Sequence, residues 1–328
     1  MSHAAVAVNA CDHVLAFALE HPWALTPDMC AVVAGILARR FAGEAIDADT
    51  IQAAVARRKA EGPTLDQGVA VIPVHGVIAP RMNLLSDMSG GTTFETLTGQ
   101  LHEALAQHAR AIVFDVDSPG GNVAGATEFA REVLKARTQV PIVAQANHLM
   151  ASAAYWLGAC ATDVVASPSA LVGGIGVYNI YNDVSKALEQ LGVKRQVIAA
   201  GRYKGEGVDG GPLTEEALAH RQGLVDGTYS RFLTDVAAGR GVSVDTVRSK
   251  YGEGRVLSAE VALDAGLITR IGTLGETLAR YLTHAPTPAI ATAQEPLPEV
   301  TAQERAALIR QDMDFARLRA KCATGSFL

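Results

Sequence analysis

The stretch that decides the fold is AIVFDVDSPGGNVAGATEFAREVLKAR, residues 111–137. It begins with the apolar, β-branched run AIVFDVD (111–117), which predicts a buried strand. It ends with AGATEFAREVLKAR (124–137), in which apolar residues recur at helical spacing. A strand that leads directly into a helix is the repeating unit of an α/β domain with parallel strands.

The same alternation continues on both sides of this stretch. Further strands are predicted at VAVIPVHGVI (69–78), PIVAQA (141–146), DVVASP (163–168) and KRQVIA (194–199). Helical spacing recurs over 94–107 and 214–240, and the apolar run 149–161 is expected to form a buried helix. We therefore expect an α/β domain with largely parallel strands over residues 65–283.

Composition changes at both ends of this domain. Residues 1–64 are alanine-rich and predict a helical N-terminal extension. Residues 284–300 form a proline- and alanine-rich linker, and a charged helical tail is expected over 301–328. The linker is expected to be exposed and open to proteolysis.

Composition and charge exclude several classes of protein. The chain has 328 residues, 49% of them hydrophobic, which is enough to build a large core. Its net charge of −6 argues against a broad nucleic-acid or anionic-membrane surface. The four cysteines have no metal-ligand spacing, so we expect reduced thiols in a cytoplasmic protein and no metal site. The apolar run 149–161 is too short to span a bilayer, so no membrane anchor is expected.

Two features of the middle region could carry chemistry. Asp117-Ser118-Pro119-Gly120-Gly121 follows a strand, and adjacent glycines can turn their amides toward a ligand oxygen, as in an oxyanion hole. A tight turn with no function explains the same residues. Ser152 stands between alanines at a strand-to-helix junction, where its hydroxyl could act as a nucleophile or could merely cap the helix.

Two further features are weaker when taken alone. Lys204 lies among glycines in AGRYKGEG (200–207), although most lysines are solvated surface charges. The small-residue turn VGGIGV (172–177) brings backbone close to a neighbour, for packing or for function.

In order and spacing these motifs resemble the signal peptide peptidase A family of serine peptidases, and within it the phage capsid-assembly (head maturation) proteases. The resemblance covers residues 69–282. It rests on VIPVHGVI, DSPGGNVAGA, the serine block that ends in Ala-Tyr-Trp, GGIGV, and the Tyr203-Lys204 pair. Lys204 stands 52 positions after Ser152, which is the interval of this family's serine–lysine pair.

The resemblance implies a role for each matched residue. Ser152 would be the nucleophile, Lys204 the general base, and the amides of Gly120 and Gly121 the oxyanion hole. The implied fold is a crotonase/Clp-type spiral of β-β-α units, which commonly assembles into homo-oligomeric rings without a cofactor. A lysine can act as the base only when it is neutral, so desolvation must lower its pKa from about 10.4 toward neutrality.

One position departs from the family pattern. The family usually has a serine where this chain has Gly174, and that hydroxyl is thought to hold the lysine amine. Ser167, Ser169, Tyr178 or a water molecule would have to orient Lys204 instead.

Other functions remain open on the sequence alone. An acyl-CoA hydratase or isomerase can share the spiral fold, but the serine block offers no glutamate as catalyst. A capsid scaffold protein that has lost catalysis is a non-enzymatic alternative, favoured by Gly174. His148 could replace the lysine as base for Ser152, although no acid is apparent to orient it.

The resemblance also implies partners and a location. A head maturation protease would act on scaffold or capsid proteins, in the host cytoplasm or inside a procapsid, and could cut its own linker. A bacterial cytoplasmic peptidase that clears peptides is the alternative.

Overall fold

The computed structural model describes residues 23–25, 64–80, 91–208 and 210–283. They all belong to one compact unit, Met1–Pro288. The predicted linker (284–300) and tail (301–328) lie outside the described residues, as does nearly all of the predicted extension (1–64).

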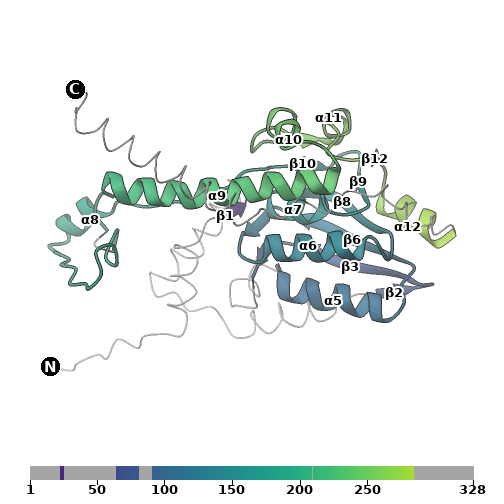
Figure 1. The fold of residues 1–328 in the computed structure, drawn as a ribbon, viewed down its shortest axis with the longest axis horizontal. Coiled ribbons are helices and arrows are strands. Elements are labelled where there is room, and N and C mark those ends of the chain that lie inside the picture. The colour runs from purple at the N-terminus through teal and green to yellow at the C-terminus, as the bar shows by residue number, and fades with distance from the viewer. Residues whose placement is uncertain (1–22, 26–63, 81–90, 209, 284–328) are drawn as a thin grey trace, which may run out of the picture. The chain divides into compact units, whose positions relative to one another are not determined.

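A mainly parallel sheet forms the centre of the molecule (Figure 1). Its long strands β3, β6 and β8 are parallel and adjacent, and β9 and β10 each add in parallel to β8. The α/β class expected from the sequence is therefore confirmed. The strands are β2 (Thr64–Asp66), β3 (Val69–His75), β6 (Ala111–Ser118), β8 (Ile142–Ala151), β9 (Asp163–Ala166), β10 (Leu171–Gly173), β11 (Val256–Ser258) and β12 (Arg270–Ile271).

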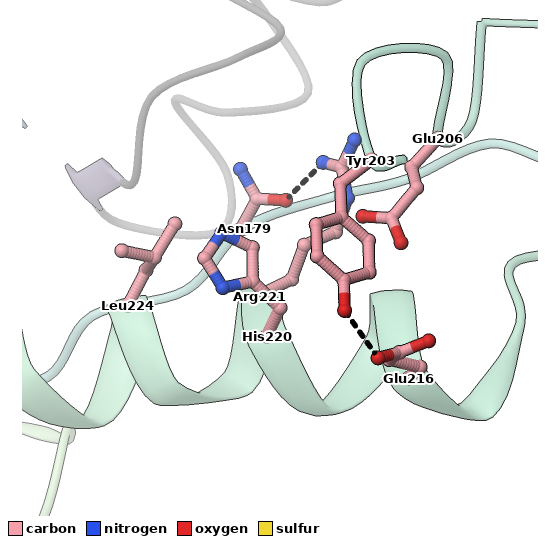
Figure 2. A pocket seen from close by; sticks show the side chains of 7 residues that line it. All are labelled: Asn179, Tyr203, Glu206, Glu216, His220, Arg221 and Leu224. Carbon is pink, nitrogen blue, oxygen red and sulfur yellow. Dashed lines mark hydrogen bonds between the residues drawn. The ribbon is translucent and has the colours of Figure 1, made fainter. Parts of the chain in front are cut away.

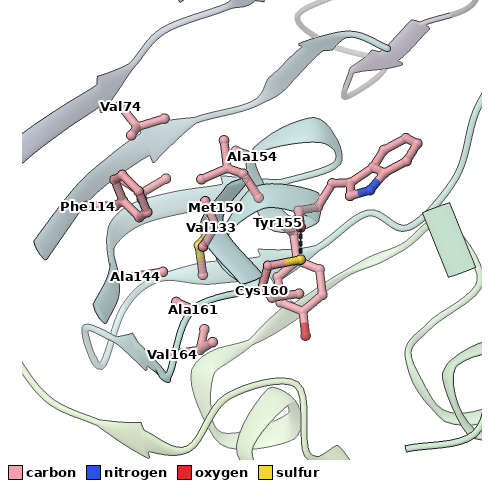
Figure 3. Packing of buried hydrophobic residues seen from close by; sticks show 14 of the residues in the cluster. Val74, Phe114, Val133, Ala144, Met150, Ala154, Tyr155, Cys160, Ala161 and Val164 are labelled. Carbon is pink, nitrogen blue, oxygen red and sulfur yellow. Dashed lines mark hydrogen bonds between the residues drawn. The ribbon is translucent and has the colours of Figure 1, made fainter. Parts of the chain in front are cut away.

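Helices cover both faces of this sheet. The larger core lies under α5, α6, α7 and α9, and Phe114 of β6 packs there edge-on against Phe129 of α6, with ring centroids 6.0 Å apart. Figure 3 shows the centre of this core, where Met150 of β8 and Tyr155 of α7 lie with side chains of the neighbouring strands. The helices are α5 (Phe94–Ala106), α6 (Ala126–Ala136), α7 (Ala153–Gly158), α8 (Ser185–Gln190), α9 (Glu215–Arg240), α10 (Val244–Lys250), α11 (Ala259–Ala265) and α12 (Leu274–Thr283).

On the opposite face, among the described residues, α12 covers the part where the strands begin. There α12 places Tyr281 against Val113 and Val143, so alternate residues of each strand are buried on opposite sides. Beyond α12 the same face continues with polar residues, which belong to the site described below.

A second, smaller sheet flanks the first. Its order is β1 (Trp23–Leu25), β7 (Gly120–Asn122), β4 (Ile78–Ala79) and β5 (Thr92–Thr93). The glycine turn predicted from the sequence thus becomes the strand β7, which has a neighbour on each side.

Local signals explain the longest helix, α9. The Thr214 side chain accepts a hydrogen bond from the Ala217 amide at 3.1 Å and caps the start, while Gly241 ends the helix in the left-handed conformation. Near its end, Phe232 stacks on Trp156 of α7 at 4.3 Å between ring centroids, and Asp235 accepts the Trp156 indole N–H at 2.8 Å. Burial raises the pKa of Asp235, and the indole hydrogen bond partly offsets that rise.

Two of the predicted elements differ from the structure. The expected strand at 194–199 is absent: these residues are irregular and exposed, and Ile198 is 92% exposed, because no neighbouring strand pairs with them. The expected helix over 149–161 begins only at Ala153, since β8 runs on to Ala151. Among the described residues, no helix has the length and apolarity that a membrane span requires.

The contact between α9 and α7 leads to a stability prediction. A methyl group at Gly239 would lie 2.3 Å from the Ala159 carbonyl oxygen, whereas one at Gly227 would meet nothing within 4 Å. We expect Gly239→Ala to lower the free energy of unfolding by about 1–3 kcal/mol through overpacking. Gly227→Ala should raise it by up to about 1 kcal/mol, because alanine favours helix. Urea unfolding of the two variants tests this, and equal effects of the same sign would contradict the packing described.

Candidate active site

Ser152 occupies a strained corner between β8 and α7. Its backbone angles are φ 59° and ψ −121°, and it is one of few non-glycine residues with positive φ among those described. Such a conformation costs about 1–3 kcal/mol and persists only where the surroundings enforce it. Strain of this kind is typical of functional positions.

The Ser152 hydroxyl does not cap the helix. It accepts no hydrogen bond from the first turn of α7, and its side chain makes none with any described residue. The residue is nevertheless 2% exposed. The capping interpretation of Ser152 is therefore wrong, and a hydroxyl without a structural task stands at a strained corner.

Backbone hydrogen bonds hold this corner in place. The Ser152 amide donates to the Gly173 carbonyl oxygen at 2.7 Å. The amide of Gly174, which follows Gly173 in the chain, donates to the Arg255 carbonyl oxygen at 2.8 Å. Both glycines have positive φ, 123° and 66°. The small-residue turn 172–177 thus supports the backbone of Ser152.

The glycine turn lies next to this corner, because α7 packs against β7. Ser118 is fully buried, donates to the Gly76 carbonyl oxygen at 2.6 Å and accepts the Gly120 amide at 3.2 Å. Gly121 lies so close to β4 that a methyl group there would be 1.9 Å from the Ile78 carbonyl oxygen. The Gly120 amide is therefore already engaged by Ser118, which leaves Gly121 as the better candidate for an oxyanion donor.

Lys204 lies outside the strands and helices that position Ser152. It is exposed and lies in residues 178–214, a segment we call the arm, which joins β10 to α9 and contains α8. Among the described residues, no hydrogen bond joins the Lys204 and Ser152 side chains. Figure 1 shows α8 near the N-terminal end of α9, away from the central sheet.

Side-chain hydrogen bonds connect the arm to α9. The Tyr203 hydroxyl donates to Glu216 at 2.9 Å, and this hydrogen bond is the main cause that raises the pKa of Tyr203. Arg221 donates to Asn179 at 3.3 Å. These side chains line a cavity of about 470 Å³ between the arm and α9, with Glu206, His220 and Leu224 (Figure 2).

The residues expected to orient Lys204 are also spread out. Ser169 is exposed in the turn between β9 and β10, and Tyr178 is half-buried at the start of the arm. Gly174 lies against Ser152, with an ideal Cβ 3.2 Å from the Ser152 amide nitrogen.

A row of acid–histidine pairs lies on the open part of the sheet face beyond α12. Asp117 Oδ2 is 2.9 Å from His148 Nδ1, and Asp115 Oδ2 is 3.3 Å from His75 Nε2. Asn147 also donates to Asp115. The sequence analysis missed the acid beside His148, although strand alternation places Asp115 and Asp117 on the face opposite Phe114.

A family model matches the part of the chain that carries Ser152. The sequence model of peptidase family S49 matches residues 135–286, a stretch that contains both Ser152 and Lys204. The chain matches peptidase family S49. The resemblance expected from the motifs is confirmed, and the turn with Gly120 and Gly121 lies before the matched stretch.

Phage proteins are among the individual proteins whose sequences are similar to this chain. Capsid assembly protease C of Escherichia phage lambda is 31% identical over 275 residues, which is 78% of this chain and 62% of that protein. Head-tail preconnector protein GP5 of Enterobacteria phage P21 is 28% identical over 272 residues, 78% of this chain and 54% of that protein. The chain thus spans between half and two thirds of the length of these relatives.

A solved structure is similar at a lower level. A mutant of ClpP1 from Listeria monocytogenes aligns with a TM-score of 0.41 at 13% identity, over 63% of this chain and 94% of that chain. Within the described ranges, no group of three or more His, Cys, Asp or Glu side chains could hold a metal ion.

Gly174 provides a test of how this site is built. Its φ of 66° favours glycine, so Gly174→Ser and Gly174→Ala should each lower the free energy of unfolding by about 1–2 kcal/mol. If a hydroxyl at this position helps to hold a lysine base, the serine variant should hydrolyse peptides faster than the alanine variant. Urea unfolding and peptidase assays on both variants measure the two effects, and two variants as stable as the parent would contradict the strain.

Proposed function

We propose that this protein is a serine endopeptidase in which Ser152 attacks the peptide carbonyl carbon. The observation that carries the proposal is the buried, strained Ser152, whose hydroxyl has no structural hydrogen bond. The match to a peptidase family over this residue supports it. The amide of Gly121, in the strand that packs against α7, would bind the developing oxyanion.

Lys204 is the proposed general base, and its exposure sets a condition on catalysis. An ammonium in water stays protonated at neutral pH, so Lys204 must be desolvated before it can take the serine proton. The arm that carries it exposes large apolar side chains, including Leu191 at 76% and Val208 at 60%. We propose that the arm is covered in a homo-oligomer, because several large apolar side chains exposed on one segment are typical of a protein interface.

His148 is the alternative base. Asp117 is placed to orient its ring, which supplies the acid that the sequence analysis did not find. Its side chain is 78% exposed, however, so no surrounding groups hold it in a water-excluded site. Asp117–His148 is therefore kept as the second candidate for the same reaction.

The phage relatives favour a role in head maturation. On this proposal the substrates are scaffold or capsid proteins, and the enzyme acts in the host cytoplasm or inside a procapsid. A peptidase that clears peptides in a bacterial cytoplasm, and a catalytically weakened scaffold protein, are the alternatives.

The nucleophile is tested by Ser152→Ala. Peptide hydrolysis and labelling by a fluorophosphonate probe should both disappear, because no other atom replaces the attacking oxygen. The free energy of unfolding should fall by at most about 1 kcal/mol, since the hydroxyl makes no hydrogen bond to lose. The matched control is Ser249→Ala, at an exposed serine of α10 that has no proposed role in the site, and it should keep full activity. Hydrolysis that persists in purified Ser152→Ala would disprove the assignment.

The base is tested by comparing Lys204→Ala, Lys204→Arg and His148→Ala. Loss of a general base should reduce kcat by about 10²–10⁴-fold, and arginine cannot substitute because guanidinium stays protonated. With a lysine base, activity should rise with pH, because only the neutral amine can accept the serine proton, and His148→Ala should remain active. An inactive His148→Ala beside an active Lys204→Ala would assign the base to the Asp117–His148 pair instead.

A further inference from the structure

Residues of the N-terminal region form a strand on β7, which carries the proposed oxyanion donor. Trp23–Leu25 pair antiparallel with Gly120–Asn122, in the register Trp23 with Asn122, Ala24 with Gly121, and Leu25 with Gly120. The other side of β7 is taken by β4, where Ile78 pairs with Gly121. Without residues 23–25, one edge of β7 would be open.

An open strand edge at this place is a binding site for an extended peptide. Backbone N–H and C=O groups of an edge strand bind a peptide by adding it to the sheet as a further strand. A substrate whose carbonyl oxygen reaches the Gly121 amide would run along the same edge. Two peptides cannot pair with one edge at once, so residues 23–25 occupy the place that a substrate would take.

Asn122 provides a second observation at this edge. It is 1% exposed, and its Oδ1 accepts the Ala124 amide at 2.8 Å. That bond fixes the orientation of the side-chain amide, and the Nδ2 donor has no partner. A buried donor without an acceptor is costly, so β7 retains a hydrogen-bonding group that residues 23–25 do not use.

The direction and length of β1 (Trp23–Leu25), which we call the inner strand, also fit a peptide in a binding site. It runs from Asn122 toward Gly120, so its carboxyl end points to the glycine turn. In the sequence, prolines stand at 22 and 27, and proline lacks the amide that a strand ladder needs. The paired segment is therefore short, which favours a contact that can be exchanged over a permanent sheet edge.

We propose that Trp23–Leu25 act as a built-in competitor that occupies the peptide-binding edge of β7. The ligand class of this edge is an extended peptide, and the inner strand must leave before one can bind. The position of the edge within the active site rests on the proposed function, whereas the competition between two strands does not.

The competition is measured by peptide binding in the absence of turnover. The full-length Ser152→Ala chain is titrated into a fluorescent peptide that copies residues 20–29, and anisotropy reports binding. Ala24→Pro and Leu25→Pro are each added to this background, because proline removes an amide from the inner strand. The matched control is Ala5→Pro, which adds a proline elsewhere in the N-terminal region.

At least tenfold tighter binding is expected for Ala24→Pro or Leu25→Pro, and no change for Ala5→Pro. Equal affinity in all four proteins, or no binding by any, would overturn the proposal. A fall in the melting temperature of the proline variants without a gain in affinity would also overturn it, because residues 23–25 would then only protect the sheet edge.

Hydrogen exchange on the chain without a proline substitution gives an independent measurement. Saturating peptide should speed the exchange of the amides of 23–25, while the amides of β7 stay protected because the peptide replaces the inner strand. Unchanged protection of 23–25 with peptide bound would disprove the competition. Fluorophosphonate labelling of the Ser152 chain separates the two proposals: absent labelling rejects the peptidase, whereas unchanged binding in the proline variants rejects the competitor.

Discussion

The hydrogen bond from the Ser152 amide to the Gly173 carbonyl oxygen, at 2.7 Å, is the constraint on which the site depends. A serine with φ 59° would relax to an ordinary conformation if its backbone were free. The bond prevents this because Gly173 ends β10, which is itself paired in parallel with the end of β8. The sheet thus supplies the free energy that keeps the corner strained, and glycines at 173 and 174 let the two backbones meet.

Parallel pairing also determines which side chains can meet beside this corner. β6 and β8 both end near it, so residues from distant parts of the sequence share one edge of the sheet. On one face these strand ends carry Met150 and Val116 into the core. On the other face, which α12 covers where the strands begin, they carry Asp117 and His148. The register of β6 and β8 shifts between Val116 and Ser118, and this irregularity lies beside the Asp117–His148 pair.

The strands and helices with strong patterns could be predicted from sequence, and the contacts between distant residues could not. AIVFDVD and AGATEFAREVLKAR form β6 and α6 because apolar periodicity records burial directly. KRQVIA has strand-like residues but no partner strand, and a strand needs a neighbour to satisfy its backbone. Motif order alone located Ser152 and the glycine turn. The partner of His148 depends on register, and the engagement of the Gly120 amide by Ser118 depends on a contact across a turn.

The nucleophile, the peptide-binding edge and the general base of the proposed site differ in how far the structure already holds them in a reactive state. Ser152 is already held in its strained conformation, so its preorganisation needs no further change. The edge of β7 is filled by residues 23–25, and Lys204 remains in contact with water. A peptide that must first displace the inner strand has a lower apparent affinity. The affinity is reduced in proportion to the fraction of molecules in which the edge is open. A base that must first be desolvated contributes nothing until its arm is covered. Proteolysis would therefore require two separate events, exchange at the edge and burial of the arm, and a monomer that has undergone neither would hold a formed nucleophile without acting on peptides.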